Sequence, residues 1–578
     1  MTFEISKNEF LRDGDPIKII SGAVHYFRNM PDTWEDIFNK LKALGCNCVE
    51  TYCAWNMHEK QKGEYDFSGI LDIAKFIKTA QQFDLMVIVR PGPYICAEWE
   101  FGGLPWWIQV DDDIEIRCKN PKYIECLDNY LDKLFEQIRP LLCTNGGPII
   151  MLQCENEYGY YGDDKEYLRY LVESFRRKGI DVPLFTSDGT KIDNLLDGAI
   201  DGVLPTLNFG SRVEENFKAF HKLYPDQPKM CMEMWNGWFD AWGDEKHHTT
   251  CAEDYAKTVD DMLKIGSLNM YMFIGGTNFG FTSGANHYET FAPDVTSYDY
   301  DALLTESGDT TPKYFAVRKV IEKYIDYPLP AVPENRTKKA YGKVTLDEKT
   351  GFFENINNLS APIHSEVPKS MEKYGTGYGF IAYQTVLNRD YSDAVLSLES
   401  LGDRAQVYIN KEMVGILYIN EELSIKINAK SGDTLTILCE NMGRANFGPK
   451  MMRKKGIAGR CLLDGKIHFS WNVFPLPMNN LENLNFTKSE FIEKTAFYRG
   501  CIDIDETHDT FLKLDNFKKG FVTINGFNIG RYWEIGPQKT LYVPASVLNQ
   551  GQNIIIVFES DGIKGTPVVE FCDAPLLG

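Results

Sequence analysis

The fold of this chain is decided by one stretch, Gly147-Pro148-Ile149-Ile150-Met151-Leu152-Gln153-Cys154-Glu155-Asn156-Glu157-Tyr158-Gly159. It starts at a Gly-Pro turn and continues through apolar residues without the alternation of a half-exposed strand, which predicts a strand buried on both faces. The apolar run then ends abruptly in charged and amide side chains. Because the parallel strands of a barrel carry their functional groups at their carboxyl ends, this ending predicts an active-site rim that includes Glu157.

Strand and helix alternate on both sides of this stretch. Eight segments have the pattern of strands, over residues 17–25, 46–56, 85–93, 147–157, 182–188, 202–209, 229–235 and 268–276. Helical periodicity separates most of them, and the helix after the fifth strand has the weakest pattern. Eight such units favour a (β/α)8 TIM barrel over residues 1–327. An open doubly wound sheet is the alternative, but no Gly-x-Gly-x-x-Gly follows any of these strands.

A different kind of sequence begins after the proline-rich segment 328–333. Helical periodicity gives way to short alternating strands separated by Gly and Asn turns, which is typical of β-sandwiches. Residues 407–415 resemble residues 522–530, and each segment is followed by a Gly-polar turn and an apolar strand. The economical explanation of this repeat is a pair of related, jelly-roll-like β-sandwich domains.

The two sandwich domains are predicted to cover residues 328–475 and 476–578. Their border falls somewhere within residues 475–490, and residues 341–367 could belong to either domain. We expect the sandwiches to support the barrel, to contribute a loop such as 445–451 to the pocket rim, or to form the contact of a homodimer. Their fold alone assigns them no function.

Composition and charge limit the class of protein. The chain has 578 residues, of which 43% are hydrophobic and 25% charged, as in folded globular proteins. Its net charge of −21 argues against a nucleic acid or an anionic membrane as partner, because proteins bind both through clustered Lys and Arg. No apolar run approaches the roughly 20 residues that a membrane span requires.

Two features bear on cellular location. The first residues show no basic region followed by an apolar core, so we expect no standard secretion signal. The 14 cysteines are too sparse for a disulfide scaffold and include no Cys-x-x-Cys pair, so we expect small buried hydrophobes rather than ligands. We therefore expect a cytoplasmic protein, and arrival at the cell surface by another route stays open.

A second carboxylate is expected across the mouth of the barrel from Glu157. The seventh strand is apolar except for Glu233, which must face something that offsets the cost of removing its charge from water. Strands four and seven lie on opposite sides of a barrel mouth, so the two carboxylates can face each other. Two carboxylates in different surroundings are the equipment for glycoside hydrolysis, whereas the alternative is two unrelated surface residues.

Aromatic residues gather at the same strand ends. Flat rings complement the C–H faces of sugars, while carboxylates and amides bind hydroxyl groups. Any one of these rings could instead pack in the core or at the rim, but together they favour a sugar pocket. They are Tyr52, Trp55, Tyr94, Trp99, Trp235, Trp238, Tyr271, Tyr298 and Tyr300.

The strand ends also carry long motifs in a fixed order. In the barrel these are 21–28 (SGAVHYFR), 50–56 (ETYCAWN), 90–105 (RPGPYICAEWEFGGLP), 153–159 (QCENEYG), 275–280 (GGTNFG) and 296–301 (TSYDYD). Two more, ENMGR at 440–444 and INGFNIGRYW at 524–533, lie in the predicted sandwiches. In sequence and order these motifs resemble those of the β-galactosidases of glycoside hydrolase family 35.

The resemblance implies an exo-acting, retaining β-galactosidase that hydrolyses terminal non-reducing β-D-galactosyl residues of oligosaccharides or glycoconjugates. It implies that Glu157 is the general acid/base and Glu233 the nucleophile of a double displacement. It also implies that the reaction requires no metal ion and no organic cofactor.

The resemblance further implies a set of substrate-binding residues. Asn156 matches the residue that binds the sugar 2-hydroxyl, and Trp238 matches an aromatic residue of the pocket wall. Glu98 and Glu100 compete for one role, and the position in the motif favours Glu98. The remaining matches to residues that hold galactose hydroxyls are Tyr52, Ala97, Tyr271 and Tyr298.

The chain also departs from the pattern of the family. Many members have Ser before the nucleophile and an aromatic residue directly after it, where this chain has Met232 and Met234. The leaving-group side of the site is therefore expected to differ. Without a secretion signal the chain resembles the bacterial, intracellular type, and the family leads us to expect β-1,3 over β-1,4 linkages.

Two alternative functions remain open at this point. A metal-dependent hydrolase could use His25, His58, Glu98 and Glu100, but these residues follow different strands without paired-ligand spacing. A catalytically inactive galactoside-binding protein would depend on its sandwiches and would be expected to lack one of the two carboxylates.

Overall fold

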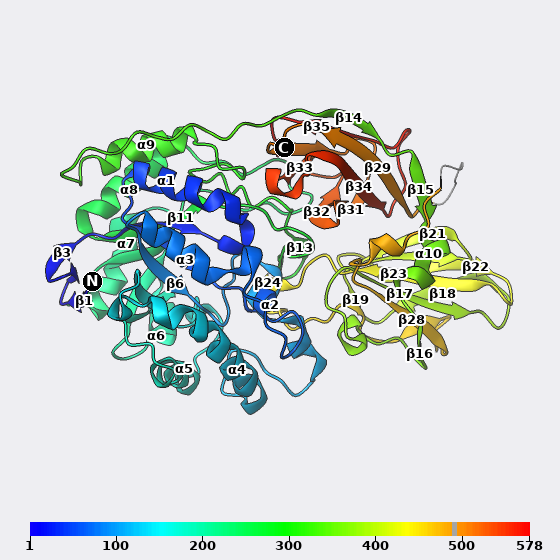
Figure 1. Ribbon diagram of the computed structural model, residues 1–578. Helices are drawn as coiled ribbons and strands as arrows, with labels where there is room; N and C mark the ends of the chain where they lie inside the picture. The colour runs from blue at the N-terminus through cyan, green and yellow to red at the C-terminus, as the bar shows by residue number, and fades with distance from the viewer. Residues whose placement is uncertain (488–493) are drawn as a thin grey trace.

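A closed barrel of eight parallel strands forms the first part of the molecule, as predicted (Figure 1). The computed structural model describes residues 1–487 and 494–578. Each barrel strand pairs in parallel with the next, and the last closes on the first. The strands are β4 (Ile20–Val24), β5 (Cys48–Tyr52), β6 (Met86–Arg90), β7 (Ile149–Gln153), β8 (Leu184–Asp188), β9 (Leu204–Asn208), β10 (Met230–Trp235) and β11 (Ser267–Ile274).

Helices cover the outside of the barrel and begin and end where local sequence allows. Helix α4 begins after Asn120, whose side chain accepts hydrogen bonds from two backbone N–H groups, and Pro121 takes its first position. The helix after the fifth strand is short, α6 (Ile192–Gly198). The other large helices are α1 (Trp34–Leu44), α3 (Ile73–Gln82), α4 (Pro121–Ile138), α5 (Lys165–Arg177), α7 (Val213–Leu223), α8 (Ala252–Ile265) and α9 (Pro312–Ile321). Within the described residues, no helix combines the length and apolarity needed to cross a membrane.

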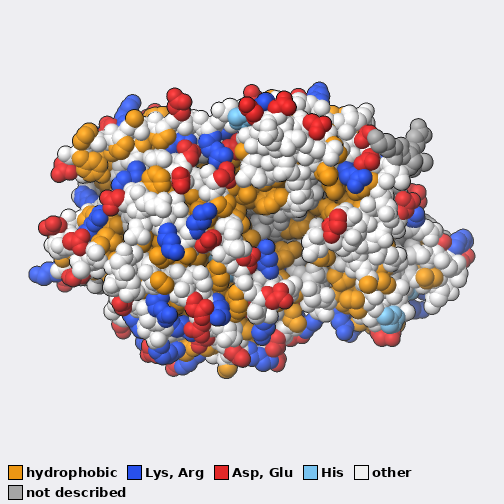
Figure 2. All heavy atoms as spheres, in the orientation of Figure 1, with side chains coloured by type: hydrophobic (Ala, Val, Ile, Leu, Met, Phe, Trp, Pro, Cys, Tyr) orange, Lys and Arg blue, Asp and Glu red, His pale blue; other side chains and the backbone are white. Residues whose placement is uncertain are grey.

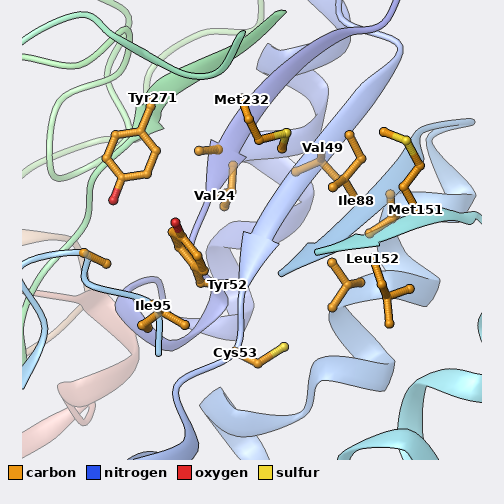
Figure 3. Close-up of a cluster of buried hydrophobic side chains, with 14 of the residues drawn as sticks. Val24, Val49, Tyr52, Cys53, Ile88, Ile95, Met151, Leu152, Met232 and Tyr271 are labelled. Carbon is orange, nitrogen blue, oxygen red and sulfur yellow. The ribbon is translucent and has the colours of Figure 1, made fainter. Parts of the chain in front are cut away.

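Side chains fill the interior of the barrel. Figure 3 shows a cluster that includes Val24, Val49, Ile88, Met151 and Met232, which come from five different strands. All five are 0% exposed. A packed centre of this kind fixes the strands relative to one another, and so fixes where their carboxyl ends project.

A small antiparallel sheet precedes the barrel and was not anticipated from the sequence. It consists of β1 (Phe3–Ser6), β2 (Glu9–Arg12) and β3 (Asp15–Ile17). Its apolar side chains Phe3 and Phe10 are buried and stack on each other, with ring centroids 5.9 Å apart. From the sequence, no strand was expected before residue 17.

The first sandwich packs a six-stranded sheet against a four-stranded sheet. Leu396 and Ile427 from the smaller sheet share a core with Ile381 and Val407 from the larger one. The larger sheet contains β16 (Ile363–Ser365), β28 (Trp471–Leu476), β17 (Phe380–Val386), β23 (Thr434–Glu440), β20 (Arg404–Ile409) and β21 (Glu412–Tyr418). The smaller contains β22 (Ser424–Ala429), β18 (Tyr391–Leu398), β26 (Cys461–Leu463) and β27 (Lys466–Ile467).

The second sandwich packs a five-stranded sheet against a four-stranded sheet. Leu512 and Phe571 from the smaller sheet share a core with Val522 and Ile555 from the larger one. The larger sheet contains β15 (Glu348–Gly351), β29 (Ala496–Ile504), β34 (Gly551–Glu559), β31 (Lys519–Ile524) and β32 (Phe527–Trp533). The smaller contains β14 (Gly342–Thr345), β35 (Val568–Cys572), β30 (Thr510–Lys513) and β33 (Thr540–Val543).

The strands do not follow the order of the predicted domains. After α9 the chain crosses to the second sandwich (Figure 1), where β14 pairs with β35 and β15 pairs with β29. Both strands lie inside residues 328–475, which the prediction assigned to the first sandwich, and within the segment 341–367 that could belong to either. Residues 488–490 of the expected border, including Glu490, lie outside the described residues.

The internal repeat corresponds to two matching hairpins. In β20–β21 the register shifts after Val407, and Asn410 has a left-handed φ of 55°. In β31–β32 the register shifts after Val522, and Asn525 has a φ of 51°. The same bulge and the same turn residue therefore occur in both sandwiches, as the similarity of residues 407–415 and 522–530 predicts.

The first sandwich is joined to the barrel by a strand of its own. Strand β24 (Ala445–Phe447) pairs in parallel with β12 (Ala285–His287), which pairs with β13 (Phe291–Pro293) after the last barrel strand. Beside β24, the buried Arg444 binds Glu100 of the barrel at 2.7 Å and Glu372 of the sandwich at 2.6 Å. Figure 2 shows hydrophobic side chains around the hollow where barrel and sandwiches meet.

Candidate active site

A cavity of about 400 Å³ lies at the carboxyl ends of the barrel strands. Glu157 follows β7, Glu98 follows β6, and Glu233 lies near the end of β10, so three strands bring carboxylates to one space. Its other lining residues are Cys96, Ala97, Tyr160, Trp235, Trp238, Phe239, Tyr271, Asn286, Tyr288, Tyr300 and Phe447. A concave, largely aromatic site with a few convergent polar groups is the usual form of a small-ligand site.

Glu233 is surrounded by hydrogen-bond donors. Tyr52 donates to its Oε1 at 2.6 Å, and Arg90 Nη2 lies 2.8 Å from the same oxygen. Trp235 Nε1 donates to Oε2 at 3.1 Å. The side chain is 9% exposed. A buried cation and two neutral donors stabilise the negative charge of this carboxylate.

Fewer groups stabilise a negative charge on Glu157 than on Glu233. Within residues 1–487 and 494–578, one donor, Asn208 Nδ2, reaches the Glu157 carboxylate, at 3.1 Å from Oε1. Burial, followed by the charge of Glu233, raises the pKa of Glu157 to about 8, against the lowering effect of Asn208. Its backbone has a left-handed φ of 47°, which is uncommon for a residue other than glycine. The two carboxylates thus share one cavity but are held in opposite environments.

Arg90 connects several parts of the site. Besides Glu233, its Nη2 donates to Asn156 Oδ1 at 2.8 Å, and its guanidinium lies 3.9 Å from the centre of the Tyr52 ring. Its Nη1 is 3.7 Å from Glu50, a fully buried carboxyl whose pKa is raised to about 7 by burial. No role for Arg90 was expected from the sequence.

Arg90 and Asn208 share a signal that could have identified them. Each is the last residue of its strand, β6 or β9, and each ends a run of largely apolar residues. The same reasoning that selected Glu233 on its apolar strand applies to both, because a buried charge or amide requires partners.

Glu98 belongs to a second polar group in the cavity. Tyr298 donates to its Oε2, and the hydroxyls of Tyr298 and Tyr271 are 3.2 Å apart. Arg28 lies 3.8 Å from the centre of the Tyr298 ring and donates to the carbonyl of Ala97 at 2.5 Å. Burial raises the pKa of Glu98 to about 7.

The structure places the predicted substrate-binding residues in two layers. Ala97, Glu98, Trp238 and Tyr271 line the cavity. Behind them, Tyr52 contacts Glu233, Tyr298 contacts Glu98, and Asn156 contacts Arg90. Trp238 is 42% exposed and its ring packs on Phe239, with centroids 5.0 Å apart.

Two neighbouring glutamates have other partners. Glu100 is fully buried against Arg444 and is absent from the lining of the cavity that Glu98 borders. Glu155 is bound by Arg117 Nη2 at 2.8 Å and by the Tyr167 hydroxyl at 2.8 Å. Both carboxylates therefore serve structural ion pairs beside the site.

One side of the cavity comes from the first sandwich. Phe447 lies on β24, and its ring centroid is 6.1 Å from that of Tyr160 and 6.2 Å from that of Tyr288. The expectation that a loop near 445–451 reaches the pocket rim is confirmed for this residue.

The residues of the metal alternative are engaged elsewhere. His25 Nδ1 is 2.7 Å from Arg28, and His58 Nε2 is 2.5 Å from the Tyr26 hydroxyl. Glu98 and Glu100 are bound by Tyr298 and Arg444. Among the described residues, the group with ligand spacing is Asp240, Asp244 and His248, which includes none of these four. There, His247 and His248 already bind the two oxygens of Asp240.

Comparisons with known proteins agree with this geometry. The model described as "Glycosyl hydrolases family 35" matches residues 9–324, and models described as "Beta-galactosidase, first all-beta domain" and "Beta-galactosidase, galactose-binding domain" match residues 368–477 and 495–553. Proteins named Beta-galactosidase from Bos taurus and Homo sapiens are 41% and 40% identical over 100% of this chain and 94% and 91% of their own. One of that name from Xanthomonas manihotis is 40% identical over 94% of this chain and 92% of its own. The chain therefore belongs to the glycosyl hydrolases of family 35.

Proposed function

We propose that this protein is an exo-acting, retaining β-galactosidase that releases terminal non-reducing β-D-galactosyl residues from oligosaccharides or glycoconjugates. One observation carries the proposal: two carboxylates share a cavity, one of them held by a buried cation and the other with a pKa raised to about 8. Such a pair supplies a nucleophile and a proton donor at neutral pH. The similarity over the whole chain to proteins named Beta-galactosidase indicates galactose as the sugar.

In the first step, a carboxylate oxygen of Glu233 attacks the anomeric carbon of galactose. The bond from that carbon to the leaving-group oxygen breaks, and the proton of Glu157 passes to this oxygen, so that a covalent galactosyl-enzyme and a free alcohol result. Arg90, Tyr52 and Trp235 orient the attacking carboxylate.

In the second step, water attacks the same carbon from the side that the leaving group has vacated. Glu157, now ionised, accepts a proton from the water, and the bond to Glu233 breaks to return both carboxyl groups to their first state. Two inversions at one carbon retain the β configuration. Neither step changes an oxidation state, and the proton that Glu157 gives up in the first step returns to it in the second.

We assign substrate binding to the residues around this pair. Asn156 accepts two hydrogen bonds at Oδ1, from Arg90 and Gln153, which orients its amide so that Nδ2 can donate to the sugar 2-hydroxyl. Glu98 is the acceptor suited to other galactose hydroxyls. The remaining assignments are Tyr52, Ala97, Tyr271 and Tyr298 for hydroxyl groups and Trp238 for the pocket wall.

The decisive experiment measures hydrolysis of a chromogenic β-D-galactoside, with proton NMR of the first anomer released. The wild type should release β-galactose, and Glu157→Gln and Glu233→Gln should each lose several orders of magnitude in kcat. Glu166→Gln, an exposed carboxylate on α5, is the matched control. Release of α-galactose first would overturn the two roles. No turnover by the wild type would favour the alternative of an inactive galactoside-binding protein.

We further propose the bacterial, intracellular type within the family, a cytoplasmic location, a homodimer and a preference for β-1,3 linkages. All 14 cysteines are free, which suits a reducing compartment. Cell fractionation tests the location, and light scattering tests the dimer by measuring the molar mass in solution. Rates of hydrolysis of paired β-1,3 and β-1,4 galactosides test the linkage preference.

A further inference from the structure

A second cavity adjoins the one that holds the two carboxylates. Its volume is about 670 Å³, against about 400 Å³ for the first. Four residues, Glu157, Tyr160, Tyr288 and Phe447, line both cavities and so mark where they meet. Beyond this junction, one wall comes from residues 115–117 of the barrel and the other from the loop of the first sandwich that follows β24.

The two carboxylates indicate which cavity holds the galactose and which holds the leaving group. Glu157 borders both, whereas Glu233 borders the first and not the second. Under the proposed function, galactose must lie where Glu233 reaches its anomeric carbon, which places it in the first cavity. The leaving group begins at the oxygen that Glu157 protonates. From that oxygen, the second cavity is the space that opens on the side of Glu157 away from Glu233.

A third cavity offers a rival path for the leaving group. It measures about 540 Å³ and is lined by Arg212, Trp235 and Trp238 among others. Neither Glu157 nor Glu233 borders it. A group bound there would have to turn away from the proton donor after leaving the first cavity, so the second cavity is the more direct path.

The walls of the second cavity are held in place before any ligand binds. The Tyr161 hydroxyl donates to the Ile116 carbonyl at 3.0 Å, and the Arg117 guanidinium lies 4.3 Å from the centre of the Tyr161 ring. Arg117 is itself fixed by its ion pair with Glu155. Across the cavity, Phe447 is fixed by the pairing of β24 with β12. A preformed site loses less conformational entropy on binding.

The chemistry of these walls suits a neutral sugar. Tyr161 presents an aromatic ring and Met452 a polarizable thioether, both of which pack on the C–H faces of saccharides. The positive charge of Arg117 is offset by Glu155, and Glu157 is protonated when the leaving group departs, so the lining keeps the negative charge of Glu115. An anionic leaving group would be repelled.

We infer that the second cavity binds the leaving group, and that this group is a neutral saccharide of at least two sugar units. The inference rests on the proposed function. The cavity exceeds in volume the one assigned to a single galactosyl unit, so it has room for a second sugar beyond the one at the junction. Met452 and Tyr161 then determine the preference for such extended substrates.

The test compares kcat/KM for three substrates of one linkage: an aryl galactoside, a neutral galactosyl disaccharide and a neutral galactosyl trisaccharide. The wild type should prefer the trisaccharide over the disaccharide. Met452→Ala should lower this ratio about tenfold, because it removes apolar contact with the second leaving sugar. Arg212→Ala, in the third cavity, should leave the ratio unchanged. As a check independent of any variant, the disaccharide released from the trisaccharide should inhibit the wild type more tightly than the corresponding monosaccharide.

Three results would overturn the inference alone, and a fourth would overturn the function on which it rests. Equal trisaccharide-to-disaccharide ratios in wild type and Met452→Ala would remove the site from this cavity. A loss of the ratio in Arg212→Ala would place the leaving group in the third cavity. Failure of the wild type on the aryl galactoside as well would overturn the proposed function itself, whereas turnover of that substrate with no preference for length would overturn only the leaving-group site.

Discussion

Arg90 and Glu233 form a buried ion pair, with Nη2 of the arginine 2.8 Å from Oε1 of the glutamate. The guanidinium is fully buried and the carboxylate nearly so. Since the same nitrogen also donates to Asn156, one arginine orients both the proposed nucleophile and the residue assigned to the sugar 2-hydroxyl.

Arg90→Met should therefore lower kcat/KM on a β-galactoside by roughly 10²- to 10³-fold, the usual effect of removing a preorganised charge from an active site. It should also destabilise the fold by about 3–5 kcal/mol, because Glu50 and Glu233 lose a buried partner. Thermal melting identifies folded protein before kinetics are measured. Arg90→Lys, which keeps a cation, should lose less activity. Near-normal turnover by Arg90→Met would contradict the role of this pair.

The raised pKa of Glu157 predicts the alkaline limb of the pH profile. Below its pKa of about 8 the carboxyl holds the proton that the leaving group needs, and above it the proton is lost, so kcat/KM should fall as pH rises through about 8. The fall should be clear with a galactosyl disaccharide and weak with an aryl galactoside whose leaving group needs no proton. The same limb with both substrates would assign it to another group.

Asn208 sets the position of that limb. Among the described residues, Asn208 is the donor that reaches the Glu157 carboxylate, and its hydrogen bond lowers the pKa of Glu157. Asn208→Ala should therefore move the alkaline limb toward higher pH and lower kcat/KM roughly tenfold through loss of orientation. Ser187 donates to Asn208 Oδ1 at 2.6 Å, so Ser187→Ala should shift the limb in the same direction by less. A limb that moves toward lower pH would contradict this reading.

Arg444 ties the first sandwich to the barrel through two buried carboxylates, Glu100 and Glu372. Arg444→Met leaves both of them unpaired and should lower the free energy of unfolding by about 3–5 kcal/mol. The control is Arg460→Ala, since Arg460 pairs with Glu399 at 3.8 Å on the surface, and its effect should stay within about 0.5 kcal/mol. Denaturant unfolding of both variants gives the comparison. Equal stability of the two would show that the buried pairs add little.

The barrel could be predicted from the sequence because its signals are local. Each strand is a short apolar run, and Glu157 and Glu233 stand out as charges at the ends of such runs. Arg90 and Asn208 end strands in the same way, yet neither was selected, because their importance depends on which side chain each one meets across the barrel.

The arrangement of the sandwich strands depends on contacts distant in sequence. Residues 341–367 could be assigned to neither sandwich from the sequence, because the partners of β14 and β15, which are β35 and β29, follow more than a hundred residues later. The residues that line the cavity could not be predicted for the same reason. Phe447 meets Tyr160 and Tyr288 only because β24 pairs with β12 of the barrel.

The pairing of β24 with β12 has an evolutionary consequence. The two proposed catalytic carboxylates belong to the barrel, whereas one wall of the cavity proposed for the leaving group comes from the sandwich loop that follows β24. Mutations in the loop after β24 can therefore broaden or narrow the range of substrates, while the catalytic residues stay under strict selection. Related enzymes should accordingly diverge in substrate choice by exchanging a sandwich loop and leaving the barrel untouched.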